Sequence, residues 1–179
     1  MLMHDAIRIA VTGPESTGKS TLAEYLAAKF GGVSVPEYAR EYLEKLGREY
    51  NFDDILKIAQ QQILNEDNAA IENKLVFCDT ELLVTKIWCD DKFGHCHSWI
   101  IDELNKRKYD LVLLCNIDLP WEPDPQREDP HRREHLMTLY QEQVVEYYGN
   151  VAEVIGEGED RLQFASKIVE ELLRNKSCL

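Results

Sequence analysis

Apolar and polar positions follow two patterns that alternate along the chain. Short, nearly continuous apolar runs predict buried strands, and longer stretches with apolar residues every three or four positions predict helices. The predicted strands are about 6–12, 33–35, 74–79, 109–115 and 151–155. The first predicted helix follows residue 20 and ends at about 30. Further helices are predicted over about 37–47, 53–73, 81–92, 97–107, 132–148 and 160–174. Because strands and helices alternate, we expect an α/β fold: a three-layer sandwich with a parallel sheet of about five strands and helices on both faces.

The length of 179 residues suits a single domain, 1–179, with a real hydrophobic core. The sequence has no internal repeat and no low-complexity segment. One region, 118–133, is rich in Pro, Asp and Arg, which predicts an exposed and mobile loop. We expect this loop to act as a lid, because ligands of such folds sit at the carboxyl ends of the strands.

Composition excludes several classes of partner. The net charge of −13 argues against nucleic acid, whose phosphates would be repelled. No apolar run approaches the roughly 18 residues of a membrane span, and the first residues do not resemble a signal peptide. The five cysteines show no disulfide framework, and Cys89, His95, Cys96 and His97 match no common zinc spacing. We therefore expect a reduced, cytoplasmic protein without membrane or nucleic-acid partners, whose oligomeric state stays open.

Residues 13–20 read Gly-Pro-Glu-Ser-Thr-Gly-Lys-Ser, a complete G-x-x-x-x-G-K-[ST] phosphate-binding loop (P-loop). A predicted strand precedes it and a predicted helix follows it, so backbone N–H groups would wrap a polyphosphate at a helix N-terminus. A chance glycine-rich turn is the alternative, but both flanks favour a nucleoside triphosphate site. Lys19 would reach the β- and γ-phosphates, and the Ser20 hydroxyl would bind Mg²⁺. The predicted nucleotide-binding residues are Gly13, Pro14, Glu15, Ser16, Thr17, Gly18, Lys19, Ser20 and Thr21.

Carboxylates stand at the ends of two predicted strands. Asp79 occupies the position from which an acidic side chain would hold Mg²⁺ opposite Ser20; a simple helix cap is the alternative. Glu37 is the candidate to orient an acceptor hydroxyl and take its proton, although Glu is also favoured at any helix start. Glu81 competes with Glu37 for the role of base.

The predicted lid carries three arginines, Arg127, Arg132 and Arg133. Arginines on a lid would neutralise charge that develops on the transferred phosphoryl group. Surface ion pairs of small energetic consequence are the alternative, and which arginine is catalytic stays open. Trp121 would stack on a base or anchor the lid.

Four segments together resemble a known family. They are the P-loop, Glu37-Tyr38-Ala39-Arg40-Glu41-Tyr42, Phe77-Cys78-Asp79-Thr80-Glu81, and Asp110-Leu111-Val112-Leu113-Leu114 followed by Pro120-Trp121 and Arg127. In this order they look like the ribosylnicotinamide kinase domain of bacterial bifunctional NAD-biosynthesis and regulator proteins. The resemblance implies a P-loop NTPase fold of the nucleoside- and nucleotide-kinase type. It also implies ATP- and Mg²⁺-dependent phosphorylation of the 5′-hydroxyl of nicotinamide riboside to the mononucleotide.

The site residues expected from the residue patterns and the resemblance fall into three groups. The catalytic group is Lys19, Glu37, Asp79, Arg127 and Arg132; the substrate-binding group is Glu37, Tyr38, Arg40, Glu81 and Trp121; the metal ligands are Ser20 and Asp79.

The chain departs from the family at the expected base-binding positions. Pro36 stands where some members have an aromatic residue, and the Gln60-Gln61-Gln62 stretch offers none. Stacking on the cationic pyridinium would then fall to Trp88, Trp121 or Tyr38. The nucleotidyltransferase motif H-x-G-H is absent, so we do not expect this chain to make the dinucleotide.

Two other functions remain open at this point. One is a kinase of another nucleoside, nucleotide or small alcohol. The other is an ATPase or GTPase switch, although the guanine motif N-K-x-D does not occur. The strand-end carboxylates favour transfer to an acceptor.

Overall fold

The computed structural model describes residues 6–126 and 131–177. Its strands are β1 (Ile7–Thr12), β2 (Val33–Val35), β3 (Leu75–Asp79), β4 (Leu111–Cys115) and β5 (Val151–Val154). Its helices are α1 (Lys19–Phe30), α2 (Tyr38–Leu46), α3 (Phe52–Glu72), α4 (Leu82–Phe93), α5 (Ser98–Lys106), α6 (Arg133–Tyr147) and α7 (Gly158–Ser177). The predicted elements and their order are confirmed. The largest differences are that β4 begins two residues later than expected and that α7 is longer at both ends.

The five strands form one parallel sheet in the order β2-β3-β1-β4-β5. The chain passes from β1 to one side of the sheet for β2 and β3, and then to the other side for β4 and β5. The connections that leave β1 and β4 therefore run in opposite directions at the carboxyl edge. This switch in strand order opens the crevice in which α/β folds bind ligands.

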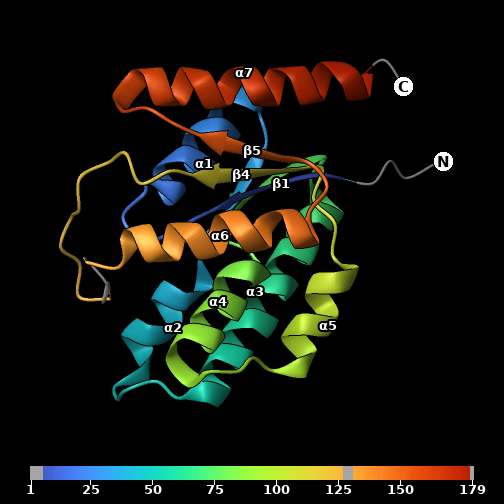
Figure 1. The fold of residues 1–179 in the computed structure, drawn as a ribbon. Coiled ribbons are helices and arrows are strands. Elements are labelled where there is room, and N and C mark those ends of the chain that lie inside the picture. Colours follow the sequence, from blue (N-terminus) through green and yellow to red (C-terminus); the bar gives the residue numbers. More distant parts are fainter. Residues whose placement is uncertain (1–5, 127–130, 178–179) are drawn as a thin grey trace.

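Helices cover both faces of the sheet, as Figure 1 shows, with α1 and α7 on one face and α3, α4, α5 and α6 on the other. The side chains of β1 alternate between these two layers: Ile9 and Val11 pack with α1 and α7, and Ala10 packs with the opposite layer. Because both faces are covered, β3 and β4 are buried at every position, which explains their continuous apolar runs. In the described part of the chain, no helix has the length and apolarity to cross a membrane.

Candidate active site

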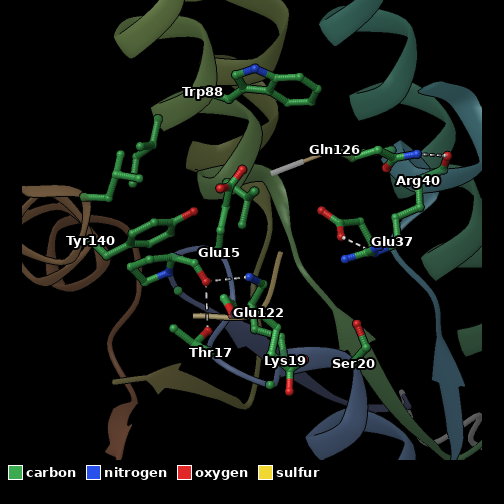
Figure 2. Close-up of a pocket in the computed structure, with 18 of the residues that line it drawn as sticks. Glu15, Thr17, Lys19, Ser20, Glu37, Arg40, Trp88, Glu122, Gln126 and Tyr140 are labelled. Carbon is green, nitrogen blue, oxygen red and sulfur yellow. Dashed lines mark hydrogen bonds and ion pairs between the residues drawn. The ribbon is translucent and has the colours of Figure 1, made fainter. Parts of the chain in front are cut away.

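A cavity of about 980 Å³ lies at the carboxyl edge of the sheet. Its walls come from the P-loop and α1, from the start of α2, from α4, and from segment 119–126 together with the start of α7. Every residue of the predicted nucleotide site lines it, and so do Glu37 and Arg40. Figure 2 shows Lys19, Glu37 and Arg40 around this cavity, with Trp88 at the end opposite Ser20.

Glycine is required at two places in the P-loop. Gly13 has φ +131°, and a Cβ there would stand 2.7 Å from the carbonyl oxygen of Cys115. Gly18 is left-handed, with φ +73°, directly before α1 begins. The Lys19 ammonium and the Thr17 hydroxyl each donate to the carbonyl of Pro14 at 2.8 Å. The loop is thus held in a closed curve with the lysine beside it, the form that binds an anion at a helix N-terminus.

Asp79 lies at the end of β3 beside the Ser20 hydroxyl and is only 4% exposed. Burial raises the pKa of Asp79, and Ser20 and Lys19 act in the opposite direction. Among the described residues, Asp79 Oδ1 has no hydrogen-bond partner. A buried, unpartnered carboxylate oxygen next to a hydroxyl fits Mg²⁺, which takes one or two protein oxygens and completes its shell with phosphates and water.

Glu37 is the N-cap residue of α2, yet its side chain accepts no capping hydrogen bond. Its carboxylate is 22% exposed, lines the cavity, and lies 3.6 Å from Nε of Arg40. Burial raises the pKa of Glu37, and the charge of Lys19 lowers it. Tyr38 is also predicted to contact the substrate. Its ring packs near Tyr42, and Tyr38 does not line the cavity.

Glu81 makes structural contacts away from the cavity, and its role as a substrate contact stays a prediction. Its side chain is 1% exposed and lies outside the cavity. The carboxylate accepts hydrogen bonds from Thr12 Oγ1 (2.8 Å), from the backbone N–H of Leu83 (2.6 Å) and from the Tyr148 hydroxyl. It caps α4 and joins that helix to β1 and to the end of α6.

Segment 119–126 spans the cavity between the P-loop and α2. On one side the N–H of Glu122 donates to Ser16 Oγ (2.9 Å). On the other side Arg40 pairs with Asp124 at 3.0 Å, and Gln126 donates to the carbonyl of Arg40 at 3.2 Å. The described part of the predicted lid therefore contacts both the nucleotide loop and the Glu37 side of the cavity.

The predicted lid arginines lie in different places. Arg127 lies outside the described residues, and Arg132 binds both carboxylate oxygens of Asp91 on α4. Their catalytic assignment stays a prediction. Arg133 donates to the carbonyl of Ser16 (3.1 Å), and its guanidinium lies 6.0 Å from the centre of the Trp121 ring. Trp121 does not line the cavity, so its position fits an anchor of this segment better than a base contact.

Sequence reasoning missed several cavity residues, among them Tyr50 and Arg161. Arg161 is 4% exposed and reaches from α7 to the carbonyls of Thr17 (3.0 Å) and Asn116 (3.2 Å). No local motif marks this arginine, because it is one charged residue in an amphipathic helix. Its place beside the P-loop results only from the packing of α7 next to α1.

The P-loop and the strand-end carboxylates define a P-loop nucleotide-binding protein. The order of the strands in its sheet gives it the fold of nucleoside and nucleotide kinases. Residues 8–161 match the family model described as an AAA domain (AAA_28), and the chain belongs to this family.

Curated relatives confirm the resemblance that the motifs carry. The chain is 34% identical over 121 residues to the "Trifunctional NAD biosynthesis/regulator protein NadR" of Escherichia coli (strain K12). It is 30% identical over 122 residues to the protein of the same name from Salmonella typhimurium (strain LT2). Each match covers 65% of this chain and 30% of the relative, so the chain spans less than a third of the relatives it matches.

Solved structures share the fold. A NadR protein in complex with NR has a TM-score of 0.73 at 23% identity, over 94% of this chain and 51% of that one. A NadR protein with NAD and AMP-PNP has a TM-score of 0.71 at 24% identity, over 94% and 50%. A deoxyadenosine kinase from M. mycoides has a TM-score of 0.65 at 14% identity, over 92% and 100%.

Proposed function

We propose that this chain is an ATP- and Mg²⁺-dependent kinase that phosphorylates the 5′-hydroxyl of nicotinamide riboside. The observation that carries the proposal is a single cavity whose walls include both the P-loop and the Glu37 carboxylate. A nucleotide-dependent switch needs no second compartment beside its phosphates, whereas a kinase must hold an acceptor there. The NadR similarity and the NadR complexes with NR and AMP-PNP support the choice of substrates.

The reaction would be an in-line transfer at the end of the P-loop. The acceptor oxygen attacks the γ-phosphorus, its proton passes to Glu37, and the bond to the β-phosphate oxygen breaks to leave ADP. Lys19 stabilises the charge that develops on the phosphoryl oxygens. Mg²⁺ held between Ser20 and Asp79 would supply further charge neutralisation on the phosphates.

The base of the acceptor would lie at the aromatic end of the cavity. Trp88 and Tyr50 line this end, and the indole N–H donates to the Tyr50 hydroxyl at 3.1 Å. Their ring centres are 4.9 Å apart in an edge-to-face arrangement, which holds the indole in one orientation. An aromatic face beside a cationic pyridinium is attractive, so Trp88 would take the role that Pro36 and the glutamine stretch do not supply.

The test is a riboside panel with ATP and Mg²⁺. We expect nicotinamide riboside to be converted to the mononucleotide, with no dinucleotide, at a higher kcat/KM than adenosine, uridine or thymidine. The Lys19→Ala variant should lose activity by several hundred-fold while its circular dichroism stays unchanged. Preference for a neutral nucleoside would overturn the acceptor, and hydrolysis that no riboside accelerates would overturn the kinase.

A further inference from the structure

The start of α2 has an unusual arrangement for a helix that begins with a carboxylate. An N-cap side chain normally accepts a hydrogen bond from the second or third N–H of its own helix. Glu37 does not, and its carboxylate faces the cavity instead. Something other than the Glu37 side chain must therefore hold this end of the helix.

Gln62 on α3 supplies that contact. Its side chain is 3% exposed, and its Oε1 accepts the backbone N–H of Tyr38 at 2.9 Å. This N–H belongs to the peptide group that joins Glu37 to Tyr38. A bond to it restrains the ψ angle of Glu37, which is 110°, and with it the direction in which the Glu37 side chain leaves the backbone.

Glu66 fixes which way the Gln62 amide points. Gln62 Nε2 donates to Glu66 Oε1 at 3.4 Å, one helical turn further along α3. Glu66 is fully buried; its other oxygen accepts the Tyr109 hydroxyl at 2.7 Å, and Nη1 of Arg107 lies 3.6 Å away. With its NH₂ group turned to Glu66 Oε1, the amide presents its oxygen to Tyr38.

From this chain of contacts we propose that Gln62 is a positioning residue for Glu37. It anchors the Glu37–Tyr38 peptide from a neighbouring helix, and so leaves the Glu37 carboxylate available to the acceptor instead of to its own backbone. The proton-accepting role of Glu37 rests on the proposed function, whereas the anchoring is a property of the fold.

Removal of the anchor has a defined consequence. Without it, the Glu37 carboxylate is free to turn onto the N–H groups of the first turn of α2, where an N-cap side chain is ordinarily stabilised. A carboxylate that accepts backbone N–H bonds has a lower pKa. The charged groups around Glu37, which are Lys19, Arg40, Asp79 and Glu15, stay the same in such a variant.

The experiment measures the pKa of Glu37 by ¹³C NMR of glutamate-labelled protein, assigned with Glu37→Gln, together with kcat and KM. In Gln62→Met we expect the pKa to fall by about one unit and kcat by about 10- to 100-fold, with KM for ATP unchanged. Gln61→Met is the matched control, one residue earlier in α3, where the side chain bonds Asn65 instead; it should change neither quantity.

Two further variants keep the test decisive if Gln62→Met fails to fold. Tyr38→Pro removes the N–H itself at the first helical position, where proline is well tolerated, and should lower the same pKa. The exchange Gln62→Glu with Glu66→Gln preserves acceptor and donor along the contact chain and should restore kcat; because it moves a negative charge towards Glu37, its Glu37 pKa should lie at or above the wild-type value. An unchanged Glu37 pKa in either folded single variant would overturn the positioning role. Because this pKa is read without turnover, a wild-type protein that phosphorylates no riboside would refute the proposed function separately.

Discussion

At the scale of single residues, Glu37 and Glu81 show how surroundings separate two similar carboxylates. Both cap helices directly after strands, and burial raises the pKa of both. Glu81 receives three hydrogen bonds in the core, whereas Glu37 has one long ion pair and an open face on the cavity. A carboxyl group with a raised pKa that can reach a ligand is suited to proton transfer, and a fully engaged one is suited to structure.

Substitution of Glu37 should therefore change the reaction rate, whereas substitution of Glu81 should change the stability of the fold. Glu37→Gln should lower kcat by about 10²- to 10⁴-fold with little change in thermal stability, because the proposed general base is lost. Glu81→Gln should lower the free energy of unfolding by about 1–3 kcal/mol, because buried hydrogen bonds are lost, while the folded enzyme keeps its kcat. Kinetics at saturating substrates and urea unfolding of both variants check this. An inactive but stable Glu81→Gln would return the role of base to Glu81.

Trp88 offers a residue-scale test of how the acceptor is recognised. Trp88→Leu should raise KM for nicotinamide riboside by roughly 2- to 30-fold, the worth of a cation–π contact, and leave KM for ATP unchanged. For the reduced riboside, whose ring is neutral, the same substitution should raise KM much less. Trp99→Leu is the matched control, since Trp99 packs against the same core but does not line the cavity. Equal losses with both ribosides would argue against a cation–π role.

At the scale of elements, α3 is the helix on which the proposed anchor depends. Its start is held by a reciprocal capping box: the Asn51 side chain accepts the N–H of Asp54, and the Asp54 carboxylate accepts the N–H of Asn51. Asp54 is buried and also binds the Arg48 guanidinium, which keeps the pKa of Asp54 well below its usual range. The capping box fixes where α3 begins, and the buried residues Ile55, Ile58, Ala59 and Ile63 fix which face of the helix, with Gln62, turns towards the core.

Removal of the Asn51 cap should lower the stability of the fold by a measurable amount. Asn51→Ala should lower the free energy of unfolding by about 1 kcal/mol, because the first turn of α3 loses an acceptor. Asn68→Ala, at an exposed position in the same helix, should be neutral or slightly stabilising, because alanine has the higher helix propensity. Urea denaturation of both variants measures the two changes in the free energy of unfolding. Equal effects would mean that the capping bond contributes little.

At the scale of the whole molecule, one buried carboxylate connects elements that lie far apart in the chain. Glu66 on α3 meets Tyr109, which precedes β4, and Arg107, which follows α5. Burial raises the pKa of Glu66 to about 7; Tyr109, Arg107 and Gln62 oppose the rise, and the charge of Glu81 adds to it. The folded protein therefore holds a proton that the unfolded chain has already released over part of the acid range.

The sign of the pH dependence follows from this proton. Between the ordinary pKa of 4.5 and about 7, the folded state binds more protons, so stability falls as pH rises and then levels off. Glu66→Gln should remove this loss, and its stability relative to the wild type should rise across that window by up to roughly 3 kcal/mol. Urea unfolding from pH 4.5 to 8 measures the difference. A difference that does not vary with pH would contradict the raised pKa.

The sequence by itself determined the features that are local. Element types follow from the spacing of apolar positions over a few turns, and the P-loop is a contiguous motif whose geometry depends on its own glycines. Asp79 and Glu37 were identifiable because a carboxylate directly after an apolar run must lie at the carboxyl edge of a parallel sheet. The roles of Arg127 and Arg132 stay predictions on the same local grounds.

Only the tertiary structure decided which polar groups meet across the chain. Glu81 is held by Thr12 and Tyr148, Gln62 reaches Tyr38, and Arg161 reaches Thr17. Each of these contacts joins residues from different elements, so no pattern within one segment encodes it. Burial and hydrogen bonding depend on which surfaces the strand order brings together. For that reason, the sequence shows where carboxylates stand, and the packing selects the one that faces the cavity.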